Sequence, residues 1–218
     1  MKTFKIILFS VIFLFSTNSF AQTTFGIRGG LNLSDVSIKS SGIGVDMTNM
    51  KPGFHIGAIL DHSFTNILAF ETGLMFETKG TKIKASTIGA STGEATTNIF
   101  YMDIPMNLKA GYNFGGIGIY GLFGPYVGFA LSSKDKYTGS FKDAFGASEY
   151  TNKIGNSDTD DIKGLDFGLS FGAGAEINKF QFGLGYDLGL ANILPGGDSD
   201  NYMKNRVLKI SVGLMFGK

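Results

Sequence analysis

The sequence predicts an all-β protein, specifically an eight-stranded antiparallel up-and-down transmembrane β-barrel. Three observations lead to this fold. Large apolar residues alternate with small or polar residues at a period of two in eight segments of the chain. The connections between these segments are alternately short and long. Only 17% of the residues are charged and 32 are glycine, which is little charge and much glycine for a water-soluble domain.

The first 21 residues are expected to be a secretory signal. Lys2 and Lys5 precede an apolar run over residues 6–15, and Ser19 and Ala21 supply the small residues that a signal-peptidase site needs. The apolar run is too short to span about 30 Å of hydrocarbon. We therefore expect residues 1–21 to be cleaved and residues 22–218 to form one outer-membrane β-barrel domain.

The eight alternating segments are long enough to cross a membrane as tilted strands. In the first segment, Phe25, Ile27 and Leu31 share one face, while Gly26 and Arg28 lie on the other. Strands of about 9–11 residues tilted near 45° span a bilayer. The expected strands are residues 25–34, 54–61, 68–79, 100–111, 117–132, 165–177, 180–190 and 208–216.

The connections predict the orientation of the barrel. The short turns are residues 63–66, 113–116 and 178–179, and the long polar connections are about 35–53, 80–97, 133–161 and 191–205. Outer-membrane barrels have short periplasmic turns and longer extracellular loops. With an even number of strands, both termini of the barrel domain should lie on the short-turn, periplasmic side of a Gram-negative outer membrane.

The polar face of the strands favours a membrane barrel over a soluble sheet. It is rich in glycine and carries scattered charges of both signs, whereas a wetted sheet would carry mainly Lys, Glu and Thr. A closed eight-stranded barrel has an interior only wide enough for side chains, and buried charges must be paired. The predicted lumen charges are Arg28, Glu71, Glu77, Lys79, Asp103, Lys109, Asp166, Glu176, Asp187 and Lys209.

Arg28 is expected to lie near an acidic residue of a neighbouring strand, with Asp61 and Asp187 as the candidates. The alternative fold is a secreted lipocalin-like barrel. That barrel would have the opposite polarity, with the Phe-rich faces inside, and would fold without lipid.

Composition excludes several classes of function. Without Lys2 and Lys5, the mature chain has a net charge of −1, so it lacks the basic excess that nucleic-acid binding requires. The absence of cysteine excludes a disulfide scaffold, a thiolate nucleophile, a Cys-based zinc site and a lipoprotein anchor.

Two motifs match the residue pattern of a catalytic or a cofactor-binding motif but lack the structural context that the motif requires. Residues 168–172 fit G-x-S-x-G around Ser170, but that motif requires a strand-to-helix turn, and this segment alternates like a strand on both sides. Residues 116–121 fit G-x-G-x-x-G, but a strand follows instead of the helix that would bind a pyrophosphate. His55 and His62 are both interpreted as packed or solvated histidines and not as catalytic bases. We therefore predict no enzyme activity, no catalytic residue and no cofactor.

Two acidic loops contain weak candidates for calcium ligands. Clustered carboxylates and amides can supply the six to eight oxygens that Ca²⁺ takes, but neither loop completes an EF-hand pattern. A solvated acidic loop is the alternative interpretation. The candidates are Asp158, Asp160, Asp161, Asp198 and Asp200.

Several stretches carry a family resemblance. They are residues 26–34, 53–57, 101–106, 124–128 and 166–169, and the Tyr-x-Asp-Ile-Pro stretch that begins at Tyr101 is the most specific. Through these stretches the chain resembles the PorT-type outer-membrane β-barrel family of Bacteroidota. The resemblance covers essentially the whole mature chain. The resemblance implies an eight-stranded, porin-like barrel. Some relatives belong to a protein-secretion apparatus, and most have no assigned role.

Three classes of function are compatible with such a barrel. The first is a barrel with a side-chain-filled lumen that displays long extracellular loops for surface binding or a structural role. The alternatives are a narrow porin-like channel for very small solutes and, less favoured, a lipid-modifying outer-membrane enzyme. Eight strands enclose no wide pore, which favours the first class. The expected partners are outer-membrane lipid and lipopolysaccharide, the barrel-assembly machinery, and a surface ligand or secretion-apparatus protein, with no nucleic acid.

Overall fold

The computed structural model describes residues 23–40, 43–45, 49–84 and 92–217, so the expected signal at residues 1–21 lies outside the described part of the chain. The strands are β1 (Thr23–Ser40), β2 (Ile43–Val45), β3 (Lys51–Ser63), β4 (Leu68–Lys84), β5 (Gly93–Phe114), β6 (Ile117–Gly139), β7 (Glu149–Thr151), β8 (Leu165–Ile177), β9 (Phe180–Gly189) and β10 (Tyr202–Phe216). The helix α2 covers Ser140–Phe145. No helix in these ranges is both long enough and apolar enough to cross a membrane.

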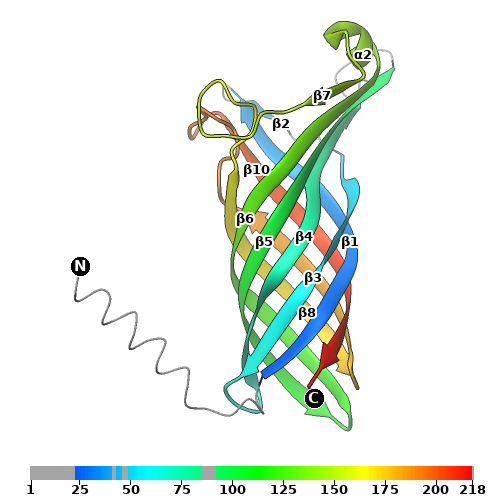
Figure 1. Cartoon of the computed structure of the whole chain (residues 1–218), viewed down its shortest axis with the longest axis vertical. Coiled ribbons are helices and arrows are strands. Elements are labelled where there is room, and N and C mark those ends of the chain that lie inside the picture. The colour runs from blue at the N-terminus through cyan, green and yellow to red at the C-terminus, as the bar shows by residue number, and fades with distance from the viewer. Residues whose placement is uncertain (1–22, 41–42, 46–48, 85–91, 218) are drawn as a thin grey trace, which may run out of the picture.

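Eight strands form one closed ring of antiparallel neighbours (Figure 1). Their order around the ring is their order in the chain: β1, β3, β4, β5, β6, β8, β9 and β10. The pairing of β1 with β10, from Phe25–Phe216 to Lys39–Tyr202, closes the ring. The short strand β2 pairs with β1, and the short strand β7 pairs with β6. Both pairings lie at the end of the barrel away from Phe25 and Phe216. The predicted eight-stranded up-and-down barrel is confirmed.

The connections divide the barrel into a short-turn end and a long-loop end (Figure 1). The short turns are residues 64–67, Gly115–Gly116 and Asn178–Lys179. Gly115 and Gly116 have φ values of 57° and 96°, and Asn178 has a φ of 54°. These are left-handed conformations, which Gly and Asn adopt at least cost and which tight hairpin turns require.

At the long-loop end the strands run further than the alternation predicts. β5 and β6 stay paired as far as Gly93–Gly139, although residues 80–97 and 133–161 are expected to be loops. In this part most residues on both faces of the strands are polar, with exceptions such as Ile99, so the period of two is lost while the hydrogen-bond ladder continues. The ends of β4, β5 and β6, together with α2, form an extension that we call the arm (residues 80–84, 93–99 and 132–145; Figure 1).

The outer surface of the barrel is an apolar belt. Outward-facing residues of β1, β9 and β10 are strongly exposed, with Leu31 at 65%, Leu184 at 62% and Ile210 at 51%. The rings of Phe25 and Phe216 contact each other in a tilted arrangement at the short-turn end, with ring centroids 5.5 Å apart. A belt of this size is typical of a surface whose solvent is lipid. Because the apolar faces point outward, the lipocalin-like alternative is wrong.

Candidate functional site

The polar faces of all eight ring strands meet in the lumen, where alternation along each strand directs every second side chain inward. The structure places all ten predicted lumen charges there, together with Asp61, in two groups. The upper network, toward the long-loop end, consists of Glu77, Lys79, Asp103, Asp166, Asp187 and Lys209. The lower network, toward the short-turn end, consists of Arg28, Asp61, Glu71, Lys109 and Glu176.

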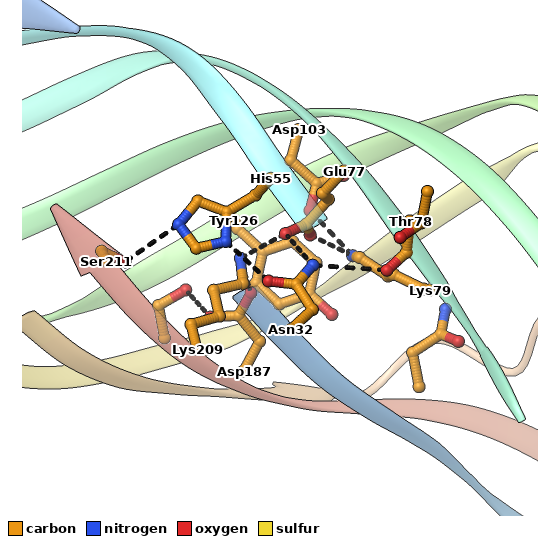
Figure 2. A network of polar contacts seen from close by, with 12 residues as sticks. Asn32, His55, Glu77, Thr78, Lys79, Asp103, Tyr126, Asp187, Lys209 and Ser211 are labelled. Carbon is orange, nitrogen blue, oxygen red and sulfur yellow. Dashed lines mark hydrogen bonds and ion pairs between the residues drawn. The ribbon is translucent and has the colours of Figure 1, made fainter. Parts of the chain in front are cut away.

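Lys79 is the centre of the upper network (Figure 2). Its Nζ atom lies 2.7 Å from Asp103 Oδ2, 3.0 Å from Asp166 Oδ2 and 3.3 Å from Glu77 Oε1. The same ammonium lies 4.7 Å from the ring centroid of Tyr101 and 4.4 Å from that of Tyr126. The Lys79 side chain is fully buried, so these contacts replace all of its hydration.

Lys209 links the upper network to β9. Its Nζ atom lies 2.7 Å from Glu77 Oε2 and also contacts Asp187. The hydroxyl of Ser170 donates a 2.7 Å hydrogen bond to Asp187, so this serine is part of the upper network. Nearby, His55 hydrogen-bonds the side chains of Asn32 and Ser211 at 2.6 Å and 2.9 Å (Figure 2).

The lower network pairs Arg28 with Glu71, which was predicted to be a lumen charge but not the partner of Arg28. Arg28 donates two hydrogen bonds, of 2.7 Å and 2.6 Å, to the carboxylate of Glu71, and a third of 2.9 Å to Gln181. Neither candidate named from the sequence, Asp61 or Asp187, forms this ion pair, although Asp61 is another member of the lower network. Glu71 lies on β4, two strands from β1, and the long arginine side chain spans the narrow lumen to reach it.

Lys109 bridges the other two acids of the lower network. Its Nζ atom lies 2.7 Å from Asp61 Oδ2 and 2.6 Å from Glu176 Oε1, and 4.5 Å from the ring centroid of Tyr120. Asp61 was absent from the predicted set of lumen charges. Its place on the polar face of its strand, in phase with His55, was the available signal.

An apolar plug covers the upper network at the long-loop end. It consists of Ile99, Tyr101, Ile162, Ala191 and Ile193, all at most 5% exposed. Two of the loops supply three of these residues, and the backbone N–H of Lys163 donates a 2.9 Å hydrogen bond to Ile193 O, which joins the loops. The plug was not expected from the sequence, because residues 133–161 and 191–205 were both predicted to be polar connections.

Two of the cavities in the described part of the chain adjoin the networks of the lumen. One, of about 80 Å³, touches residues of both networks, including Arg28, Asp187 and Lys209. The other, of about 430 Å³, lies at the short-turn end and is lined by Asp61, Lys109 and Glu176 among others. The larger of these two cavities therefore lies at the short-turn end, and the plug lies at the opposite end.

Neither the G-x-S-x-G match nor the G-x-G-x-x-G match is followed by a helix; both lie in or at the start of a strand. Ser170 is in the middle of β8, and the G-x-G-x-x-G match covers the turn before β6 and the start of that strand. His62 contacts the hydroxyl of Thr23 at 2.7 Å and lies far along β3 from His55. The ring nitrogens of His55 contact Asn32 and Ser211 and not Ser170.

The acidic loop residues hold the loop backbone in place. Asp160 accepts a 2.8 Å hydrogen bond from the Ser157 N–H, and Asp161 accepts one of 2.8 Å from Lys153. Asp198 accepts the backbone N–H groups of Asp200 and Asn201, which lower the pKa of its carboxyl group. Within the described ranges, the one group of three acidic residues close enough to share a metal ion is in the lumen and includes none of the five loop candidates, Asp158, Asp160, Asp161, Asp198 and Asp200.

Comparison with known proteins assigns a family. Residues 20–194 match the family described as "Outer membrane protein beta-barrel domain". No curated protein matches the sequence. Similar solved structures include Ail of Yersinia pestis, with 17% identity over 89% of this chain and 99% of that chain and a TM-score of 0.42. OprG from Pseudomonas aeruginosa has 15% identity over 88% and 95% of the two chains, with a TM-score of 0.44. Neisserial surface protein A has 12% identity over 89% and 97%, with a TM-score of 0.44.

Proposed function

Because the chain belongs to the outer membrane protein β-barrel domain family, we propose that it is a sealed outer-membrane barrel that presents its arm and loops at the cell surface. The protein is located in the outer membrane. Its role there would be surface binding or structural support, and not solute transport or catalysis. The observation that carries this proposal is the buried apolar plug above two networks of ion pairs that cross the lumen.

Three layers across the lumen support its closure. The plug covers the long-loop end with side chains that are almost entirely buried. Below it, Lys79 and its three carboxylates fill the section between β4, β5 and β8. Further down, Arg28 and Glu71 connect β1 with β4. A solute would have to displace buried ion pairs, whose separation costs several kcal/mol, so a narrow channel is the weaker proposal.

The arm supports a role at the surface. β4, β5 and β6 continue past the plug, and α2 lies at their tip (Figure 1). Tyr137 and Phe145 stack there, with ring centroids 4.7 Å apart, and Phe145 remains 62% exposed. Loops held on a rigid scaffold are a frequent location for binding sites. We propose that the arm, rather than the lumen, meets any partner.

Export and family placement complete the proposal. Residues 1–21 would be removed as a signal peptide, and the barrel-assembly machinery would insert the remainder beside lipid and lipopolysaccharide. The resemblance to the PorT-type family of Bacteroidota supports a place in that group and makes a secretion-apparatus protein one class of partner. The short turns would face the periplasm.

The orientation can be tested with single cysteines, because the natural chain has none. Asp143 is an exposed residue of α2, and Asn66 is an exposed residue of a short turn. A membrane-impermeant maleimide should label the Asp143→Cys variant on intact cells, and should label Asn66→Cys only after the outer membrane is permeabilised. Labelling of Asn66→Cys alone on intact cells would invert the orientation and remove the basis for surface display.

A further inference from the structure

The outward face of β10 carries two basic residues directly above the apolar belt. Leu208, Ile210 and Val212 are exposed on this face, and residues two apart in a strand share a face. The next outward positions toward the long-loop end are therefore Arg206, which is exposed, and Lys204, which is half-buried. Two residues advance about 6.5–7 Å along a strand. Both side chains thus lie just beyond the hydrocarbon, at the level of lipid head groups.

The protein does not neutralise these two cations. No ion pair among the described residues includes Arg206 or Lys204. Asp35 is opposite Arg206 on β1, but its carboxylate accepts hydrogen bonds from the backbone N–H of Val36 at 2.7 Å and from the hydroxyl of Thr81 at 3.2 Å. The guanidinium of Arg206 therefore has donors available for an acceptor from outside the chain.

The surroundings of the two cations suit the interface between membrane and water. Tyr202 follows on the same face, and the Nζ atom of Lys204 lies 4.9 Å from the centroid of its ring. Tyrosine is enriched at this interface, where its ring sits among the head groups. Across the pairing of β1 with β10, Ser37 is opposite Lys204 and Lys39 is opposite Tyr202. Lys39 forms an ion pair with Asp200 at 2.8 Å, so its charge is already compensated.

The belt below these residues selects a lipid as the source of an anion. Leu33 of β1 and Leu208 of β10 pair one step below Arg206, and both are 37% exposed at the upper edge of the belt. Acyl chains that cover this edge bring their head group to the height of Arg206 and Lys204. A guanidinium binds a phosphate through two parallel hydrogen bonds, and an ammonium adds a point charge. A small anion in solution would gain only exposed charge contacts, which contribute little.

We propose that Arg206 and Lys204 bind a phosphate group of a membrane lipid whose acyl chains lie on the belt beneath them. The site is on the outer wall of the barrel, apart from the arm and from the lumen. It rests on the proposed orientation for one point only, which is the leaflet. With the long loops outside the cell, the lipid is one of the outer leaflet, where lipopolysaccharide carries phosphates on its lipid A part.

Lipid A binding to the refolded protein tests the proposal. Residues 22–218 would be refolded in a neutral detergent and titrated with lipid A in the same detergent at constant ionic strength, and native mass spectrometry would count the bound lipid. We expect one tightly bound lipid A per chain, and weaker binding of the same lipid after its phosphates are removed. Arg206→Gln should weaken the affinity about fivefold, and a variant that also carries Lys204→Gln should weaken it further. The control Lys179→Gln removes an exposed cation at the short-turn end and should change the affinity by less than about twofold.

Three results would overturn the proposal. They are equal affinities for intact and dephosphorylated lipid A, equal losses from Arg206→Gln and Lys179→Gln, and full competition by millimolar sodium phosphate, which would make this a site for a soluble anion. Circular dichroism would confirm that each variant folds, and Lys204→Gln alone serves if Arg206→Gln does not. Reversed cysteine labelling would move the site to the inner leaflet without changing the titration, and a failed titration would leave the labelling unchanged.

Discussion

Replacing Lys79 with methionine is expected to lower the free energy of unfolding by about 3–5 kcal/mol, because it leaves buried carboxylates without their cation. Methionine is an unbranched side chain that can occupy much of the same space. The loss would therefore come from charge and not from a cavity. Asp103 and Asp166 would each lose an ion pair, of 2.7 Å and 3.0 Å respectively.

The matched control for this variant is Lys136→Met in the arm. Lys136 pairs with Glu149 at 3.2 Å, but both side chains are 59% exposed, so its loss should cost less than about 1 kcal/mol. Urea titration of both variants in lipid vesicles measures the difference. Equal stabilities for Lys79→Met and Lys136→Met would contradict the assignment of Lys79 as the central ion of the lumen.

Replacing Ile210 with arginine is expected to destabilise the barrel by about 2–4 kcal/mol, because a cation then faces hydrocarbon near the middle of the membrane. Ile210 pairs with Leu31 on β1 and with Leu184 on β9, and all three residues are strongly exposed on the apolar belt. The same vesicle titration measures the effect.

The control for the belt is Thr151→Arg. Thr151 is exposed on β7, beyond the apolar belt, so the added cation would remain in water and the stability should change by less than about 0.5 kcal/mol. If Ile210→Arg were as well tolerated as Thr151→Arg, Ile210 would not face lipid.

The sequence was a reliable guide wherever one face of a strand meets lipid and the other meets the lumen. Alternation placed Ile27 outside and Arg28 inside, and it gave β8 its bounds, Leu165–Ile177. A shift of one residue would expose the polar face to lipid, so the phase of each strand is strongly determined. The short turns could also be predicted from the sequence. Gly115 and Gly116, for example, are residues that adopt the left-handed conformation of a tight turn at little cost.

Alternation says little about structure beyond the membrane. Above the belt most residues on both faces of β5 and β6 are polar. The strands stay paired as far as Gly93 and Gly139, but the sequence there has no alternation of apolar and polar residues that would predict this. Asn205 was assigned to a loop, although it lies on β10 and donates a 2.9 Å hydrogen bond to Asp166. The plug residues Ile162 and Ile193 come from segments far apart in sequence, and their contact depends on how two loops fold over the barrel mouth.

Partners inside the lumen were harder to predict than membership in it. In an eight-stranded barrel every inward side chain is within reach of strands beyond its own neighbours. Arg28 therefore forms its ion pair with Glu71 on β4, although the neighbouring strand β3 carries Asp61. Charge type and face follow from the sequence, whereas pairing follows from the lengths of side chains and the width of the lumen.

The conductance of the refolded barrel tests the central claim most directly. Residues 22–218 would be reconstituted into planar bilayers in KCl, with a general porin in a parallel bilayer as the positive control. The sealed lumen predicts no steady conductance above that of the protein-free bilayer, since the plug and both ion-pair networks close the path. A steady ohmic conductance from the wild-type protein would contradict the account and establish the narrow channel instead.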